Sequence, residues 1–168
     1  KLEKKELISY QRYKGCELTG EGERIAIQII RKHRLWETFL VNKLEFGWEE
    51  VHDVAEQLEH IHSVKLIDSL DQFLGHPKFD PHGDPIPDKD GNISYRESEI
   101  QLSEAAAKSL VEVVSVNEDS LSLLKYLDEL KLRLGTLLEV HERYSFDESV
   151  RVKVKRKNKS VEMNLSKK

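Results

Sequence analysis

The sequence lacks several features that would place it in common protein classes. Its 168 residues include a single cysteine, Cys16, which excludes an internal disulfide and fits a reducing cytosol. No apolar run approaches the roughly 20 residues that a membrane-spanning helix needs. A net charge of −4 gives no general attraction for nucleic acid, so any DNA binding requires a local basic patch. We therefore expect a cytoplasmic protein with no membrane partner.

Proline is scarce and confined to one segment. All four prolines lie in HPKFDPHGDPIP, residues 76–87, and a helix does not tolerate that density, so residues 76–92 are predicted to form an extended loop. Before this loop, apolar residues at helical spacing predict one helix over about residues 20–44 and another over about 49–74. Thr19 is the expected N-cap of the first helix.

Strand signals flank the helical segment on both sides. Residues 7–19 place strand-forming residues around Lys14 and Gly15, which predicts a β-hairpin. A helix over about residues 103–108 is expected to lead out of the loop. The elements predicted after it are a strand at 110–116, a helix at 120–131, a strand at 135–144 and a hairpin at 149–165. The predicted fold class is therefore α+β, with a β-rich module at the C-terminal end.

The segment VHDVAEQLEHIH, residues 51–62, contains three histidines and three acids but no lysine or arginine. On a helix, one arc of about 100° carries His52, Glu56, Glu59 and His60. Acids on a helix face repel one another when no base separates them, and a bound cation relieves that repulsion. Imidazole and carboxylate are ligands of divalent transition metals, and the absence of cysteine favours Mn²⁺ or Fe²⁺ over a structural zinc. The alternative is an amphipathic helix with a solvated polar face.

The preceding helix supplies a second histidine–acid pair. His33 and Glu37 lie four residues apart, at the border of its apolar face. A lone histidine there is more often a packed residue than a ligand. Two antiparallel helices could nevertheless bring this pair against the arc on residues 51–62, and six such nitrogen and oxygen ligands suffice for one or two metal ions.

The motifs LTGEGERIA, RKHRLWETFL, VHDVAEQLEHI and HPKFDPHGDPIP, in this order, resemble the iron- and manganese-dependent repressors of the diphtheria toxin repressor family. The resemblance covers roughly residues 1–90, and the β-rich region after 110 resembles the SH3-like (ferrous-transport-A type) domain of longer members. It implies three parts. Residues 1–19 are the end of a winged helix-turn-helix with its wing hairpin, residues 20–109 are a helical metal-binding and dimerisation domain, and residues 110–168 are the SH3-like domain.

The resemblance also implies roles for individual residues. The residues that match the family's regulatory metal site are Glu56, Glu59 and His60. Those that match its ancillary site are His33, Glu37 and His52, and His33 also serves the regulatory site in manganese-type members. Because Glu56 stands where iron-sensing members have cysteine, Mn²⁺ is expected as much as Fe²⁺.

Two further pairs of residues are candidates from the same resemblance. Glu118 and Asp119 lie near the place where the C-terminal domain contributes metal ligands in some members. Arg12 and Lys14 on the wing could contact DNA phosphates, although they also suit an ordinary turn.

The implied function is metal-dependent repression of manganese or iron uptake, with the divalent metal as co-repressor. The expected protein is a homodimer that binds operator DNA through an N-terminal domain, most of which this chain lacks, so we expect the natural protein to begin earlier.

An enzyme is the alternative: His52 and Asp53 form the dipeptide of metal-dependent phosphohydrolases with a histidine–aspartate dyad. Against that alternative, Asp53 points about 100° away from His52 on a helix, so no enzymatic activity is expected.

Overall fold

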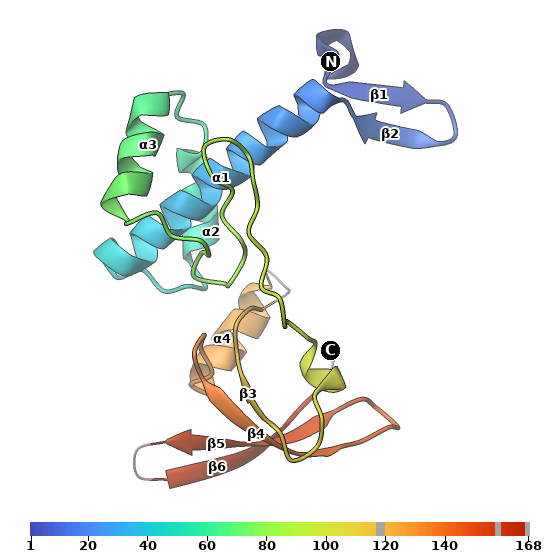
Figure 1. Cartoon of the computed structure of the whole chain (residues 1–168), viewed down its shortest axis with the longest axis vertical. Helices are drawn as coiled ribbons and strands as arrows, with labels where there is room; N and C mark the ends of the chain where they lie inside the picture. Colours follow the sequence, from blue (N-terminus) through green and yellow to red (C-terminus); the bar gives the residue numbers. More distant parts are fainter. Residues whose placement is uncertain (117–119, 157–158, 167–168) are drawn as a thin grey trace. The chain divides into compact units, whose positions relative to one another are not determined.

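The computed structural model describes residues 1–116, 120–156 and 159–166, and the chain divides into two compact units at residues 95 and 96 (Figure 1). The elements of the first unit are a 3-10 turn Glu3–Lys5, β1 Ile8–Gln11, β2 Gly15–Leu18, α1 Gly20–Leu44, α2 Val51–Leu58 and α3 Val64–Phe73. Those of the second are a 3-10 turn Leu102–Glu104, β3 Leu110–Glu112, α4 Leu121–Glu129, β4 Leu137–Arg143, β5 Val150–Arg156 and β6 Lys159–Leu165. The predicted α+β class is confirmed.

The predicted N-terminal hairpin and the start of the first helix are confirmed. Strands β1 and β2 pair antiparallel, and Tyr13 and Gly15 turn the chain with φ angles of 67° and 96°. The Thr19 hydroxyl accepts a hydrogen bond from the Gly22 amide at 3.1 Å and donates to the Glu6 carbonyl at 2.6 Å. Thr19 therefore caps α1 and fastens the hairpin to it.

The helical core forms where α2, α3 and the proline-rich loop pack on the second half of α1. Its buried apolar residues are Leu35, Trp36, Leu40, Val51, Ala55, Ile67, Leu70 and Ile86. Arg34 of α1 holds the loop in place, because its guanidinium donates to the Pro85 carbonyl at 2.5 Å and lies 3.5 Å from the Asp80 carboxylate. The loop is extended, as predicted, with an isolated bridge between Phe79 and Pro85.

The single helix predicted over residues 49–74 is wrong. The structure has two helices, α2 and α3, separated by residues 59–63. The Ser63 hydroxyl accepts from the Leu66 amide at 3.3 Å, so it caps a new helix and competes with continuation of the old one. Apolar spacing continues through the break, since Ile67 and Leu70 of α3 also pack on α1. The apolar periodicity alone therefore does not reveal the break between α2 and α3.

In the second unit the described strands form an antiparallel sheet in the order β3-β4-β5-β6. Its core residues are Ala105, Leu132, Leu138, Val140, Val150, Val152 and Val154. The helix predicted over 103–108 is wrong: the chain forms a 3-10 turn and then becomes extended at Ala105, which packs in the sheet core. The strand predicted at 110–116 is regular over Leu110–Glu112, and the short helix, the next strand and the terminal hairpin form as predicted.

Gly22 is the point where α1 passes closest to the hairpin. A Cβ at this position would lie 1.9 Å from the Leu7 carbonyl oxygen, whereas a Cβ at Gly20, in the same helical turn, would meet nothing within 4 Å. We expect Gly22→Ala to lower the free energy of unfolding by about 1–3 kcal/mol. Gly20→Ala is the control and should stay within about 1 kcal/mol of wild type. Urea denaturation measures both, and equal effects would contradict the close contact.

Candidate metal centre

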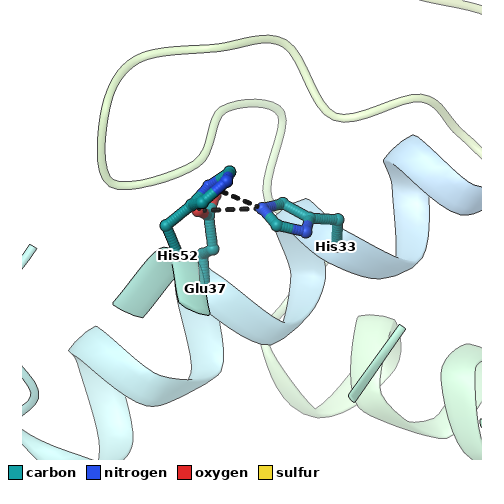
Figure 2. Close-up of side chains that lie close together, drawn as sticks. All are labelled: His33, Glu37 and His52. Carbon is teal, nitrogen blue, oxygen red and sulfur yellow. Dashed lines mark hydrogen bonds and ion pairs between the residues drawn. The ribbon is translucent and has the colours of Figure 1, made fainter. Parts of the chain in front are cut away.

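Two helices bring three ligand atoms together at one point (Figure 2). His33 and Glu37 lie one turn apart on α1, and His52 reaches them from α2. The His33 Nε2 atom lies 3.1 Å from Glu37 Oε1 and 3.2 Å from His52 Nδ1, and His52 Nδ1 lies 3.5 Å from the same carboxylate oxygen. Ligands bound about 2.1 Å from one metal ion lie roughly 3.0–3.4 Å apart. These three residues, the His33 cluster, therefore have the donor atoms and the spacing of a divalent-metal site.

The second oxygen of Glu37 faces another cluster, formed with Asp80 and His82 of the proline-rich loop. His82 Nδ1 lies 3.7 Å from Glu37 Oε2, while His82 Nε2 lies 2.6 Å from the Trp48 carbonyl oxygen. A carbonyl can only accept, so Nε2 carries a proton and Nδ1 faces the carboxylate. A histidine that ligates a metal commonly donates its other N–H in this way. The His82 cluster is thus a second possible metal site.

The loop builds this second cluster with its own backbone. The Asp80 carboxylate accepts from the amides of His82 at 2.9 Å and Asp84 at 3.0 Å. The indole of Trp48 stacks on the imidazole of His82 at 6.0 Å between ring centroids. Asp80 and His82 are each about 5% exposed, and Glu37 is 3% exposed. Neither Asp80 nor His82 is among the residues predicted from the sequence. The available signal was an acid and a histidine two residues apart in a rigid, proline-bounded loop.

The ionisation of the two clusters follows from burial opposed by charge pairing. Burial alone would raise the pKa of Glu37, but the hydrogen bonds and charges of His33 and His82 outweigh it and lower this pKa to about 2. Burial would lower the pKa of His82, yet Glu37 and the Trp48 carbonyl raise it to about 9. Burial and the charges of Glu37 and Asp84 raise the pKa of Asp80 to about 6. Protonated histidine is therefore the countercharge of the buried Glu37 carboxylate.

The other predicted ligands lie outside the two clusters. Glu59 directly follows α2, and its Oε2 atom lies 2.8 Å from the second ring nitrogen of His33, Nδ1. Glu56 and His60 are exposed and line a shallow hollow with Asp53 and Gln57. Because α2 ends at Leu58, His60 does not follow the helical wheel on which it was predicted. The regulatory site of Glu56, Glu59 and His60 stays a prediction.

The remaining candidates lie elsewhere in the chain. Glu118 and Asp119 are outside the described residues. Arg12 and Lys14 are exposed near the tip of the hairpin, with the Arg12 guanidinium 5.0 Å from the centre of the Tyr13 ring, and their contact with DNA stays a prediction. Within the described part of the chain, neither metal-ligand cluster includes Asp53, so the structure does not assemble a histidine–aspartate dyad with His52.

Both units match known protein families. Residues 19–88 match the metal binding and dimerisation domain of iron dependent repressors, and residues 100–168 match the FeoA domain. A solved manganese-dependent transcriptional repressor in complex with manganese is 34% identical with a TM-score of 0.85, over 98% of this chain and 75% of that chain. ScaR with bound Cd²⁺ is 33% identical with a TM-score of 0.77, over 98% of this chain and 75% of that one.

Two curated relatives match about half of this chain, and the matched part is well under two thirds of each relative's own length. The iron-dependent repressor IdeR of Mycobacterium tuberculosis (strain ATCC 25618 / H37Rv) is 38% identical over 87 residues, which are 52% of this chain and 38% of that protein. A probable metal transport system membrane protein of Chlamydia trachomatis is 42% identical over 84 residues, 50% of this chain and 18% of that protein. Among the residues described here, no helix has the length and apolar character needed to cross a membrane.

The raised pKa of His82 sets the expected pH dependence of the metal-free chain. A group whose pKa rises on folding stabilises the fold fully below its ordinary pKa of 6.5 and loses that contribution as the pH passes its folded pKa, about 9. We expect the free energy of unfolding to fall between pH 6.5 and 9, and to fall less in His82→Gln. Urea denaturation across this range measures it. His76→Gln is the control, because His76 is 70% exposed and outside both clusters. Identical slopes in the two variants would contradict the His82–Glu37 pairing.

Proposed function

Because the chain belongs to the diphtheria toxin repressor family of iron- and manganese-dependent transcriptional repressors, which are not enzymes, we propose that it is the metal-sensing part of such a repressor. The observation that carries the proposal is a buried carboxylate, Glu37, shared between the His33 cluster and the His82 cluster. The repressor would control manganese or iron uptake in the cytoplasm, with the divalent metal as co-repressor.

The donor set supports Mn²⁺ or Fe²⁺ as the bound ion. Both clusters consist of imidazole nitrogens and carboxylate oxygens, and Cys16, the one cysteine of the chain, lies on β2 of the hairpin. Such donors suit borderline and hard divalent ions better than soft ones. The similar manganese-dependent repressor was solved in complex with manganese, which agrees with this choice.

The chain's own residues suggest how binding is coupled to regulation. His33 and Glu37 belong to α1, His52 to α2, and Asp80 and His82 to the loop, so ligands of the two clusters come from three separate segments. A bound divalent ion supplies positive charge that neutralises Glu37 and holds these segments together. Such ordering shifts the population toward one arrangement of the helical unit. In a homodimer that arrangement would set the spacing of two operator-binding domains.

Two other functions deserve comparison with this one. A phosphohydrolase of the histidine–aspartate type is not supported, because the family is not enzymatic and Asp53 lies outside both clusters of the described residues. A metal-sensing module attached to a transporter is favoured by the similarity to the chlamydial metal transport system membrane protein. Both the repressor and the transporter module require metal binding, and operator binding by the full-length protein distinguishes them.

The metal site is tested by anaerobic calorimetric titration of the metal-stripped chain with Mn²⁺ and then Fe²⁺. We expect saturable binding of one or two ions per chain, and a loss of roughly tenfold or more in affinity for His52→Ala, because a ligand is removed. His62→Ala is the matched control: His62 is exposed and outside both clusters. No saturable binding by either ion, or equal effects of the two variants, would refute the proposed sensor.

The homodimer is tested through the exposed apolar residues of α3. Val64 is 78% exposed and Phe73 is 63% exposed, which is unusual for a helix whose other face is packed. We propose that they lie in the dimer interface and expect Phe73→Asp to shift sedimentation toward the monomer. Ile100→Asp, at a position 57% exposed in the second unit, should leave the oligomeric state unchanged. A wild-type monomer at all concentrations and metal levels would contradict the dimer.

A further inference from the structure

The second unit contains a hollow of about 310 Å³ beside the turn that joins β4 to β5. Tyr144 and Phe146 of this turn line it together with Tyr126 of α4, so two separate segments contribute aromatic rings. Asp147 of the turn and Asn164 of β6 add polar groups. The hollow includes no residue of the two metal-ligand clusters, so it is a different place in the molecule.

Hydrogen bonds within the turn fix the groups that line the hollow. The Tyr144 amide donates to the Ser149 carbonyl at 2.9 Å, and the Ser149 amide donates to the Asp147 carboxylate at 3.0 Å. The Tyr144 hydroxyl donates to Glu142 Oε2 at 3.2 Å, and the same oxygen accepts from the Arg151 guanidinium at 2.6 Å. The Tyr144 ring and the Asp147 carboxylate are therefore held in place before a ligand binds, which lowers the entropic cost of binding.

The aromatic rings meet at an angle and remain accessible to solvent. The planes of the Tyr144 and Phe146 rings are 62° apart, with 6.2 Å between the ring centres. Phe146 is 83% exposed, and Tyr126 is 47% exposed. A single exposed aromatic residue is ordinary, but exposed rings gathered around one hollow indicate a binding surface.

The charge of the hollow favours a cation. Among the described residues that line it, Asp147 carries the only formal charge, and that charge is negative. The face of an aromatic ring is also partly negative, so it attracts a cation that lies within about 6 Å of the ring centre. Organic cations suit such a surface, because a guanidinium or an alkylated ammonium is weakly hydrated and has apolar surface of its own. A divalent metal ion needs more oxygen or nitrogen ligands than one carboxylate provides.

We propose that this hollow binds an organic cation, an alkylated ammonium or a guanidinium group. The positive group would lie against the rings of Tyr126, Tyr144 and Phe146, beside the Asp147 carboxylate. Its source is either a free small molecule or an arginine side chain of another protein. The proposal goes beyond metal sensing, because it gives the second unit a ligand of its own and does not depend on the metal site.

The test is a nuclear magnetic resonance titration of the full chain, with binding followed by the ring signals of Tyr126 and Tyr144. One pair of probes is choline and its neutral isostere 3,3-dimethylbutan-1-ol. The other is an acetylated glycine–arginine–glycine amide and the same peptide with citrulline, which is neutral, in place of arginine. We expect saturable shifts with a cation and at least about fivefold weaker binding of its neutral counterpart, since only the charge differs. Tighter binding of choline identifies a free small molecule as the source, and tighter binding of the peptide identifies a protein side chain.

Two substitutions locate the bound cation. Phe146→Leu removes a ring and Asp147→Asn removes the charge, and each should weaken cation binding by about threefold, because such contacts are modest at an exposed site. Tyr95→Leu and Asp90→Asn are the matched controls: both positions are exposed, belong to the first unit and lie outside the hollow, so they should keep the wild-type affinity. Circular dichroism checks that each variant is folded.

Three results would overturn the proposal. They are the absence of a saturable shift with either cation, equal binding of a cation and its neutral isostere, and variants of the hollow that bind as tightly as the controls. Each of them leaves the metal site intact, since that site is tested separately by titration with Mn²⁺ and Fe²⁺.

Discussion

The helical unit depends on one buried charge, the carboxylate of Glu37. A carboxylate that is 3% exposed is costly to keep ionised unless its oxygens are paired. Here one oxygen faces His33 and His52, and the other faces His82. The pairing lowers the pKa of Glu37 to about 2, so the group stays charged inside the core. A divalent ion bound at either oxygen would continue the same compensation, which makes this position suited to sensing a cation.

The fold contributes by fixing where the partners of Glu37 come from. The hairpin and the Thr19 cap define the start of α1, and Leu35 and Leu40 anchor its second half in the core. The histidine and the acid of α1 thereby lie on a rigid element. The loop is less regular, yet Arg34 of α1 holds it against the same helix through the Pro85 carbonyl and the Asp80 carboxylate. Ligands on rigid supports can keep a metal geometry that flexible loops would lose.

Much of the first cluster could be predicted from the sequence. His33 and Glu37 are four residues apart, so helical geometry alone brings them together, and the acid-rich segment that contains His52 shows no countercharge. The second cluster could not be predicted in this way. The contact of His82 with Glu37 and Trp48 joins residues more than thirty positions apart, through a loop that has no periodicity. Periodic spacing in a sequence indicates which residues share a helix face. It does not indicate which distant residues a loop brings into contact.

The break after Leu58 shows how an error in one predicted helix boundary changes the predicted site. A continuous helix would place His52, Glu56, Glu59 and His60 on one arc, whereas the grouping of Glu56, Glu59 and His60 as a regulatory site comes from the family resemblance. In the structure the helix ends, Glu59 turns to His33, and Glu56 and His60 remain exposed. The cause is a helix cap. Ser63 caps the start of a new helix, α3, and the packing of Ile67 and Leu70 in the core stabilises that helix. Apolar periodicity favours one continuous helix here, but the cap residue determines where the helix is interrupted.

The two clusters differ in their access to solvent, and this difference bears on how ions would exchange. The side chain of His52 is 49% exposed, whereas that of His82 is 6% exposed and has one ring nitrogen committed to the Trp48 carbonyl. At His82 a metal ion must displace the proton from Nδ1, the nitrogen that pairs with Glu37. At the His33 cluster the exposed imidazole of His52 offers a path from water. An ion bound as proposed would therefore equilibrate with the surrounding medium most easily through His52, and its charge would act on the enclosed cluster through the shared Glu37 carboxylate.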